Sequence, residues 1–363
     1  MREGRGASAL PLLLRPSLFP MRPLLLLATL FCAGGTAACV RSEAQSRTPR
    51  LVWSGDTIDA HARLLRDAAD STHGEMVLKP VSARSDAGVL LISDLGSDRV
   101  AVLDSNANVM RWIGAHGRGP GELYGAAHIA ADSAHVFVAE ALGGRVSEFT
   151  IAGRFVRAFS SPFGAGAIVA EGGDTYVAAR SYSHYADRLR ADAEPSPALR
   201  RAIVRGHGPG QRWRAMPGHD LLASADAAIW TFDQATLELC TFASAAAHPR
   251  CLALPRDLER RIDRYRDTRV AAVEKATRLE VKAAPVAKDM IGVGHRLALL
   301  LPLPDLPVVV VDPADGSLTP VVFRGASAAL WVRSARTFAW TQGAFVLAGD
   351  DGIGRLELAS PLR

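Results

Sequence analysis

Two histidines stand at comparable points of the chain, each a short distance after a Gly-Pro-Gly run. His128 comes seven residues after the Gly-Pro-Gly at 119–121, within the run 117–122 (GRGPGE), and His219 comes nine residues after the Gly-Pro-Gly at 208–210, within the run 206–211 (GHGPGQ). Imidazole is a common ligand of divalent metals and a common general acid or base. A zinc or calcium site would need at least one further ligand close by. The two histidines are therefore candidate metal ligands, and the alternative is that they are hydrogen-bonded groups of a core or channel wall.

Two cysteines lie in neighbouring apolar runs that are separated by a short polar connection. Cys240 is in residues 237–242 and Cys251 is in residues 250–254, at nearly equal distances from the middle of the connection. A β-hairpin would therefore place them opposite one another, with Cβ atoms ~4.5–5.5 Å apart, which is close to the range that a disulfide needs. The spacing is not C-x-x-C, which argues against a redox active site. We expect a disulfide, with two reduced, half-buried cysteines as the alternative.

The first 38 residues have the features of a secretory signal segment. Arg22 precedes an apolar run over residues 24–31, and small residues then extend to Ala38. A basic start, a short apolar run and small residues are typical of a signal peptide. The apolar run is too short for the ~20 residues that a membrane-spanning helix needs. The segment 1–38 is expected to direct export, with Met21 as an alternative start of the chain.

Cys39 follows directly, and residues 36–39 (TAAC) resemble a bacterial lipobox, in which the cysteine is lipidated and becomes the mature N-terminus. Thr36 departs from the aliphatic residue that is usual at its position. We expect lipidation of Cys39, with residues 39–49 as a polar tether, and plain cleavage after Ala38 as the alternative. The protein would then lie in the cell envelope or periplasm and would contact the membrane only through its lipid anchor.

Composition and charge exclude several classes of protein. The chain has 363 residues, of which 48% are hydrophobic and 22% charged, too apolar a composition for a disordered chain. Its net charge of +5 is concentrated at the start, because residues 1–38 carry four arginines and one glutamate. The remaining 38 basic and 36 acidic side chains form no cationic stripe of the kind that binds nucleic acid.

Internal repetition is the strongest signal in the chain. An apolar run that ends in an acidic residue is followed five residues later by an arginine, at Asp94 and Arg99, at Glu140 and Arg145, and at Asp350 and Arg355. Each unit has an apolar run, a polar turn and an alternating strand. A period of about 40–50 residues with several short strands predicts a β-propeller, because small sheets packed in a ring bury each other's faces. The repeated acid and arginine are expected to bridge a turn or neighbouring blades.

The run at 117–122, the strand at 136–140 and the segment 145–156 resemble NHL-repeat and related bacterial six-bladed β-propellers. The likeness is best over residues 86–160, and Leu123 and Glu140 depart from the phenylalanine and aspartate of the pattern. The resemblance implies six blades around a central channel, with five or seven blades as the alternatives. Some six-bladed relatives bind a divalent metal in that channel through histidines or carboxylates and use it for lactone hydrolysis or lyase chemistry.

Six blades can be placed on the sequence, at about 75–113, 114–158, 160–205, 206–254, 285–323 and 324–359. Innermost strands line the channel of a propeller, so His128 and His219 would face one cavity. Aligned by the repeat, blade one offers Ser82 and blade five offers Asp289 as a further ligand, whereas the neighbouring Lys288 would oppose a cation.

Two segments fall outside the repeat. Residues 256–282 have apolar side chains at spacings of three, four and seven, between Pro255 and Pro285, which predicts an amphipathic helix packed on the rim or covering one channel mouth. The strand expected at 50–54 would join the last blade beside residues 355–358 and close the ring.

The sequence thus predicts an all-β fold over residues 50–363, a six-bladed β-propeller with one amphipathic helical insertion. The favoured function is an exported binding or interaction module, monomeric and without a cofactor, whose partner is an envelope protein, a peptide or a glycan. The alternative is a metal-dependent hydrolase or lyase, using calcium or zinc, with its site in the channel around His128 and His219. A purely structural envelope component is the third reading.

Overall fold

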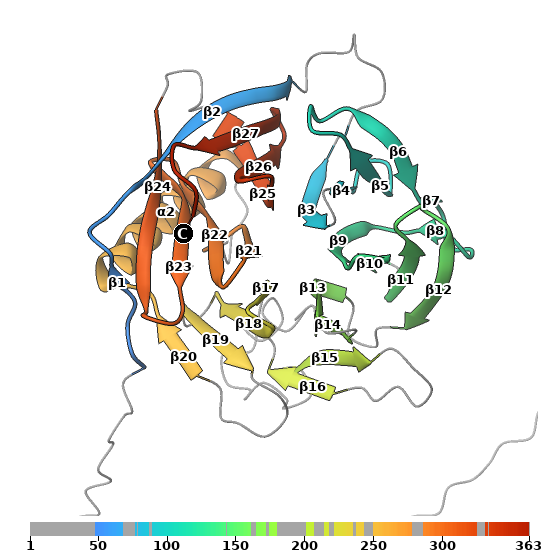
Figure 1. Cartoon of the computed structure of the whole chain (residues 1–363), viewed down its shortest axis with the longest axis horizontal. Helices are drawn as coiled ribbons and strands as arrows, with labels where there is room; N and C mark the ends of the chain where they lie inside the picture. Colours follow the sequence, from blue (N-terminus) through green and yellow to red (C-terminus); the bar gives the residue numbers. More distant parts are fainter. Residues whose placement is uncertain are drawn as a thin grey trace, which may run out of the picture. The chain divides into compact units, whose positions relative to one another are not determined.

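The computed structural model describes residues 48–362 apart from 68–76, 78, 87–88, 143, 161–164, 172–173, 180–200, 207–213, 218–220, 235–236, 243–249, 278–285, 325–330 and 333. Short antiparallel sheets dominate this part of the chain and are arranged around one axis (Figure 1).

The first three blades are separate four-stranded sheets. Blade one consists of β3 (Pro80–Asp86), β4 (Val89–Asp94), β5 (Arg99–Leu103) and β6 (Val109–Ile113). Blade two consists of β9 (Ala126–Ala131), β10 (His135–Glu140), β11 (Arg145–Thr150) and β12 (Phe155–Ser160). Blade three consists of β13 (Ala165–Glu171), β14 (Asp174–Ala179), β15 (Arg201–Gly206) and β16 (Arg214–Pro217).

The other three blades complete the ring. Blade four consists of β17 (Leu221–Ala225), β18 (Ala228–Asp233), β19 (Glu238–Phe242) and β20 (Arg250–Ala253). Blade five consists of β21 (Asp289–Val293), β22 (Arg296–Leu303), β23 (Leu306–Asp312) and β24 (Ser317–Arg324). Blade six consists of β25 (Ala335–Thr341), β26 (Ala344–Gly349), β27 (Gly352–Leu358) and β2 (Ile58–Asp67).

The innermost strands form a closed cycle. Contacts run from β3 to β9, β13, β17, β21 and β25, and from β25 back to β3. Figure 1 shows these six strands around the central axis of the ring. The fold is a six-bladed β-propeller with one helical insertion, as the repeat predicts.

The ring is closed by β2, which is the outermost strand of blade six although it lies at the start of the described chain. It pairs antiparallel with β27, from Ala60 opposite Leu358 to Asp67 opposite Gly352. It also pairs parallel with β24, so blades five and six form one continuous nine-stranded sheet. Pairing both edges of β2 removes the exposed edges that an open sheet would present.

The prediction that the strand at 50–54 pairs beside residues 355–358 is wrong. The strand β1 (Val52–Trp53) pairs parallel with β24 of blade five instead, through Val52 N to Gly316 O at 2.9 Å and Ser54 N to Leu318 O at 3.0 Å. The following segment supplies the closing strand, because its alternation buries Ala60 and turns His61 to solvent in the manner of a strand with one covered face.

The two Gly-Pro-Gly runs have different places in the fold. Residues 117–122 connect blades one and two, where β7 (Ala115–His116) and β8 (Glu122–Leu123) form a short parallel pair. The run at 206–211 begins at the end of β15, and the next strand, β16, belongs to the same blade. The boundary between blades three and four that the sequence placed between residues 205 and 206 is therefore wrong, and residues 207–213 lie outside the described part of the chain.

Apolar side chains from neighbouring blades form the core. One cluster joins Leu91 and Val102 of blade one to Ile129, Val138 and Phe149 of blade two, each at most 1% exposed. Each sheet is thus covered on both faces by its neighbours in the ring, which satisfies the requirement that a β-sheet bury its apolar face.

Close approach of two inner strands depends on a glycine of β21. A Cβ atom added to Gly292 would lie 1.6 Å from the carbonyl oxygen of Ser224 on β17. No side chain fits there without moving one backbone, so glycine sets the distance between blades four and five.

The helix α2 (Arg256–Thr277) connects blade four to blade five. Its first turns place Leu258 and Ile262, both fully buried, in a cluster with residues of those two blades, and Tyr265 packs against the same cluster. Arg261 Nη2 pairs with Asp305 Oδ2 at 2.7 Å. The predicted helix extended to 282, but residues 278–285 lie outside the described part. No helix in the described ranges is long and apolar enough to cross a membrane.

Candidate functional site

The axial channel is the candidate site, because side chains from six different strands come together there. Ser82 lies on β3, His128 on β9 and Asp289 on β21, all three of them innermost strands, and Lys288 directly precedes β21. His219 lies outside the described residues.

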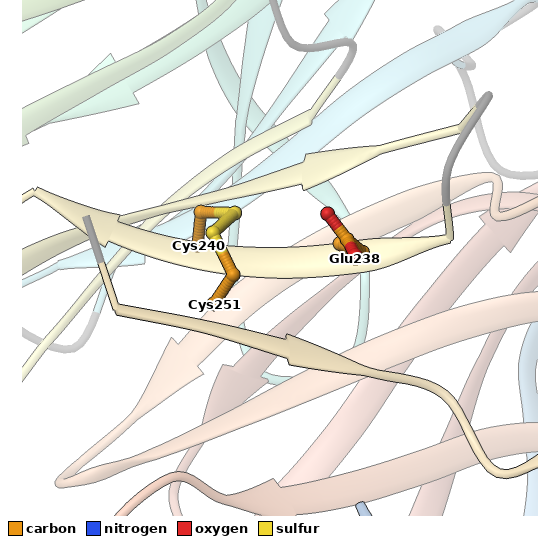
Figure 2. A group of neighbouring side chains, drawn as sticks. All are labelled: Glu238, Cys240 and Cys251. Atoms are coloured by element: carbon orange, nitrogen blue, oxygen red, sulfur yellow. A yellow bond between two sulfur atoms is a disulfide. The ribbon is translucent and has the colours of Figure 1, made fainter. Parts of the chain in front are cut away.

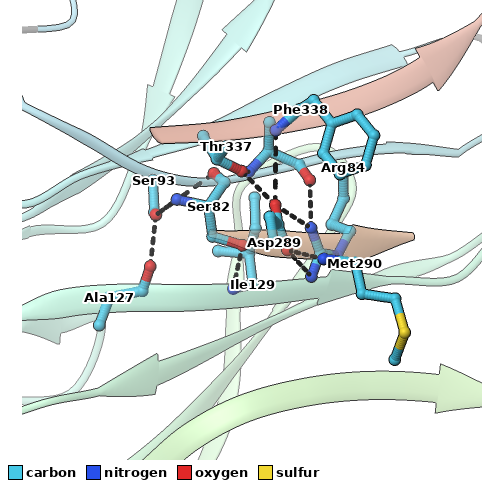
Figure 3. A network of polar contacts seen from close by, with 10 residues as sticks. Ser82, Arg84, Ser93, Ala127, Ile129, Asp289, Met290, Thr337 and Phe338 are labelled. Atoms are coloured by element: carbon cyan, nitrogen blue, oxygen red, sulfur yellow. Dashed lines mark hydrogen bonds and ion pairs between the residues drawn. The ribbon is translucent and has the colours of Figure 1, made fainter. Parts of the chain in front are cut away.

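Asp289 is the centre of a polar network that reaches three blades (Figure 3). Its Oδ2 atom accepts from Arg84 Nη1 at 3.1 Å and its Oδ1 atom accepts from Arg84 Nη2 at 3.3 Å. Oδ2 also accepts a short hydrogen bond from the hydroxyl of Thr337 and a longer one, 3.4 Å, from the backbone N–H of Phe338. Oδ1 accepts from the N–H of Met290 at 2.8 Å. Both carboxylate oxygens are therefore occupied.

The network is continued on both sides of the carboxylate. Thr337 Oγ1 accepts from the N–H of Ala83 at 2.7 Å, and Arg84 Nη1 donates to the carbonyl of Ala83 at 2.6 Å. Asp289 is 6% exposed, and a buried carboxylate is tolerated only when a counter-charge and hydrogen bonds replace its hydration. Arg84 supplies that counter-charge from blade one, so the network links blades one, five and six.

Ser82 has a structural role beside this network. Its hydroxyl oxygen accepts from the N–H of Ile129 at 3.3 Å, and its own N–H donates to Ser93 Oγ at 3.0 Å. Ser93 Oγ donates to the carbonyl of Ala127 at 2.5 Å. These bonds join the inner strands of blades one and two (Figure 3).

The expectation that Asp289 could serve as a metal ligand meets a physical obstacle. Its charge is balanced by the guanidinium of Arg84, and five hydrogen bonds already use its two oxygens. A cation at the same oxygens would have to displace Arg84 and would lie close to its positive charge. In this structure Asp289 holds the ring together and leaves no oxygen free for a metal.

Among the described residues, one group of three side chains has metal-ligand atoms within 4.8 Å of one another, namely Glu238, Cys240 and Cys251 (Figure 2). The sulfur atoms of Cys240 and Cys251 are joined in a disulfide. Metal binding by cysteine needs the free thiolate, so this group does not form a metal site. The proposed sharing of a metal by His128 and His219 stays a prediction, because His219 is not described.

The disulfide joins a directly opposed pair of the hairpin formed by β19 and β20. Cys240 and Cys251 are register partners, and their Cα atoms are 4.1 Å apart. The sequence spacing had placed the two cysteines opposite one another in such a hairpin. Closing a loop of 11 residues is expected to stabilise the fold by about 2–3 kcal/mol, through the entropy of the unfolded chain.

Next to the Asp289 network, the channel widens into a cavity of about 150 Å³. Each of the six innermost strands contributes two or three lining residues, mostly from its second half. Arg84 is the one charged side chain among them, and Ser85 and Ser224 are the hydroxyl groups. Ser224 Oγ donates a short hydrogen bond to Glu171 Oε2 at the end of β13.

Lys288 directly precedes the first residue of β21, whereas the cavity is lined mostly by the second halves of the inner strands. Its ammonium donates to the carbonyl of Ala335 at 2.7 Å. Burial, together with the positive charges of Arg269 and Arg336, lowers the pKa of Lys288 from 10.5 to about 8. The carboxylate of Asp350 acts in the opposite direction on this pKa. Lys288 therefore has a larger neutral fraction near neutral pH than an ordinary lysine.

The repeated acid and arginine bridge a turn in blade two. Arg145 Nε donates to Glu140 Oε1 at 2.7 Å, and Arg145 Nη2 donates to the carbonyl of Glu122 at 2.8 Å. This ties the turn of blade two to the inter-blade connection that contains the Gly-Pro-Gly run. Ser147 Oγ also donates to Glu140 Oε1 at 2.7 Å, so the fully buried carboxylate is satisfied.

The other two copies do not repeat this contact. Asp94 accepts from backbone N–H groups, including that of Lys79 at 2.7 Å, and Arg99 stacks over the ring of Trp112. Asp350 pairs with Arg336 rather than with the arginine five residues later. The direct bridge between acid and arginine is therefore found in blade two, whereas elsewhere single members of the pair bond to turns, as Asp94 does to Gly96 N and Arg355 to the carbonyl of Gln342.

Arg84 and Thr337 are the network residues that sequence reasoning missed. Arg84 interrupts a strand of small and apolar residues, and a charged side chain at an inward position of an inner strand is the one signal that could have identified it. Its partner Asp289 is 205 residues away in the sequence, so no local pattern connects the two.

The lowered pKa of Lys288 can be tested by chemical labelling, because the chain has lysines at four positions, 79, 275, 282 and 288. We expect acetylation of Lys288 to rise with pH around a midpoint near 8, set by burial and the neighbouring arginines, and the other three lysines serve as internal references in the same sample. Peptide mass spectrometry after pulses of acetic anhydride between pH 6 and 11 measures each midpoint. A Lys288 midpoint equal to the other three would contradict the assignment.

The lowered pKa of Lys288 should also make the stability of the folded state depend on pH. The pKa of Lys288 is lower in the folded chain than in the unfolded chain, so the unfolded chain binds more protons between pH 8 and 10.5. The free energy of unfolding should therefore rise with pH over that range, and Lys288→Met should remove this increment. A pH dependence that is the same in Lys288→Met would contradict it.

The chain matches no family model and no curated protein sequence. Among solved structures, a streptogramin B lyase is similar with a TM-score of 0.51 and 9% identity, over 82% of this chain and 98% of that one. A gluconolactonase from Xanthomonas campestris gives a TM-score of 0.51 and 14% identity, over 86% and 94% of the two chains. A putative exported protein from Bacteroides fragilis gives 0.51 and 9%, over 86% and 98%. At these identities the likeness shows the β-propeller fold and nothing finer.

Proposed function

We propose that this protein is an exported β-propeller that serves as a binding or interaction module of the cell envelope, held there by a lipid on Cys39. The observation that carries the proposal is the state of the channel. Its central carboxylate, Asp289, is neutralised by Arg84 and fully hydrogen-bonded, as a structural element requires. The NHL-like blade pattern supports the same reading.

Catalysis needs an acid, base or nucleophile that is free to react in a cleft. Among the described channel residues, Asp289 and Ser82 are engaged in bonds between blades, and Lys288 donates to a backbone carbonyl. The rigid ring that results is suited to presenting loops to a partner, with the blades fixed by cores between sheets. No cofactor is invoked in this proposal, and the protein is taken to act as a monomer.

A partner surface is available on the loops around the connection between blades one and two. Leu142 is 61% exposed in the turn between β10 and β11 and lies next to Gly125. The guanidinium of Arg118 stacks over the ring of Tyr124 at 4.4 Å, and the ring of His116 meets Tyr124 edge-on. Aromatic side chains and arginine are enriched where proteins contact one another, so we expect an envelope protein, a peptide or a glycan to bind here.

The sequence offers three more aromatic residues for a binding patch of this kind, Tyr182, Tyr185 and Trp213, and all three lie outside the described residues. The surface defined by His116, Arg118, Tyr124 and Leu142 takes their place in the proposal.

The second candidate function is a metal-dependent hydrolase or lyase with its site in the channel around His128 and His219. The position of His128 on β9, an innermost strand, is the observation that favours it. Solved structures with the same fold include a streptogramin B lyase and a gluconolactonase, which shows that the fold can carry such activities. Calcium or zinc would be the metal.

Metal analysis separates the two candidates. The purified protein, equilibrated with zinc and calcium and then desalted, is analysed for bound metal beside His128→Ala/His219→Ala. As a matched control, His135→Ala removes a histidine that pairs with Asp132 in a turn. The binding module predicts no stoichiometric metal that depends on His128 and His219. Near-stoichiometric metal that is lost in the double variant but kept in His135→Ala would overturn it in favour of the enzyme.

Export and lipidation form a separate prediction. In a bacterial host fed labelled palmitate, the full chain should take up label and fractionate with membranes, because Cys39 would be the only attachment point. Cys39→Ser should lose the label and appear in the soluble periplasm, while Cys32→Ser within the signal segment should not change the labelling. Label that persists in Cys39→Ser, or protein that stays in the cytoplasm, would contradict the anchor.

A further inference from the structure

The cavity beside the Asp289 network has the properties of a small-molecule site, distinct from the loop surface proposed for a macromolecular partner. It measures about 150 Å³, and all six innermost strands contribute to its wall. Ser85, Ser224 and Trp340 in the wall are only partly buried, so solvent reaches the cavity. A pocket made by rigid strands is largely formed before a ligand arrives, which lowers the entropic cost of binding.

Arg84 lines this cavity, and one edge of its guanidinium is not used by the hydrogen bonds of the Asp289 network. Its Nη1 group donates to Ala83 O and Asp289 Oδ2, and its Nη2 group donates once, to Asp289 Oδ1. A guanidinium has five N–H donors, so the Nε–H and the second Nη2–H have no acceptor among the described residues. These two donors lie on one edge of the planar group, at the spacing that binds a carboxylate through two parallel hydrogen bonds.

The wall across the axis offers the complementary group. Blade four faces blade one in a ring of six, and its strand β17 contributes Ser224 to the cavity. The Ser224 hydroxyl gives its proton to Glu171 Oε2, so its oxygen is left as an acceptor. The negative charge of Glu171 behind it favours a donor that is positively charged. This side of the cavity therefore fits an ammonium or hydroxyl group.

Apolar and small side chains form the rest of the wall. Ala131, Ala170 and Ala223 leave space, while Ile291 and Trp340 provide apolar contact. The ring of Trp340 is held edge-on against Phe345, with centroids 4.7 Å apart. A cavity of this size accommodates a benzene-sized molecule, so a ligand would have about six to eight non-hydrogen atoms.

We propose that the axial cavity binds a small carboxylic acid that carries a hydrogen-bond donor at its other end, that is, a small amino acid or hydroxy acid. The carboxylate pairs with the Nε/Nη2 edge of Arg84, and the amino or hydroxyl group donates to Ser224.

The charges around the cavity fit this ligand. Asp289 balances Arg84 through the Nη1/Nη2 edge of the guanidinium, so an incoming carboxylate at the adjacent Nε/Nη2 edge adds one negative charge to the site. The ammonium of Lys288, adjacent to Asp289 in the chain, supplies further positive charge near the network. The ligand's own ammonium would offset the charge of Glu171, so an amino acid should bind more tightly than the hydroxy acid of the same shape.

Four probes of nearly equal size test each half of the proposal on the full chain. L-alanine has both groups, L-lactate replaces the ammonium by a hydroxyl, propionate lacks the donor, and L-alanine methyl ester lacks the carboxylate. Binding is measured by ligand-observed NMR and calorimetry up to 20 mM. We expect alanine to bind more tightly than lactate, propionate at least fivefold more weakly than alanine, and the ester at least tenfold more weakly.

Two variants locate the binding to this cavity. Ala131→Leu fills it from β9 and should abolish binding. Arg84→Lys keeps a cation for Asp289 but removes the two-donor edge, so it should weaken binding of alanine at least tenfold. Arg63→Lys is the matched control, because Arg63 pairs with Glu357 at 3.3 Å on the exposed surface of blade six. Thermal unfolding checks that each variant folds.

Four results would overturn the proposal or one of its parts. Absence of binding by alanine and lactate at 20 mM would overturn the proposal, as would unchanged binding in a folded Ala131→Leu variant. Equal binding of the ester and alanine would overturn the role of Arg84, and equal binding of propionate and alanine would overturn that of Ser224. None of these results depends on the metal analysis or on the loop surface, so they test the cavity independently of the proposed function.

Discussion

Six inner strands converge on one axis, and a charge that is buried there must find its partners within the protein because it has lost its hydration. Asp289 is the buried charge at the axis to which this constraint applies. Its carboxylate is 6% exposed and is bonded by side chains or N–H groups of blades one, five and six. The position of Arg84, and with it the shape and polarity of the axial cavity, follows from the need to neutralise that charge.

Closure of the ring brings together blades one, five and six, which share the Asp289 network. Blades five and six are joined in one sheet through β2, which comes from the start of the described chain and pairs with both β24 and β27. Blade six then meets blade one, where Ala83 N donates to Thr337 Oγ1. The backbone pairing at the outer edge and the ion pair at the axis thus act on the same junction. A ring that is joined both at its outer edge and at its axis is a rigid support for loops and for a preformed cavity.

Repetition in the sequence was sufficient to predict the fold, because each blade is a local unit whose apolar runs and turns are visible within about 45 residues. The hairpin spacing of Cys240 and Cys251 and the amphipathic helix were predicted for the same reason. Ring closure was assigned to residues 50–54 instead of β2, because polar residues in β2 conceal an alternation that only the pairing with β27 explains.

The candidate site was less accessible from the sequence. Ser82 and Asp289 were found because alignment of the repeats places them on inner strands, but their roles depend on contacts between distant blades. Arg84 and Asp289 are 205 residues apart, and no spacing rule links them. Asp289 considered alone has the character of a metal ligand, and only its pairing with Arg84 shows that it serves the structure.

A double-mutant cycle on Arg84 and Asp289 tests the central role of this pair most directly. Free energies of unfolding in urea are measured for Arg84→Met, Asp289→Asn and the double variant, with Arg261→Met and Asp305→Asn as an exposed pair for comparison. We predict that each single variant at the axis costs about 3–5 kcal/mol, since each leaves a buried polar group without its partner, and that the double variant costs much less than the sum. The exposed pair should show a coupling of about 0–1 kcal/mol. Axial variants that are additive and cost no more than the exposed ones would contradict the claim that this ion pair holds the ring and shapes its cavity.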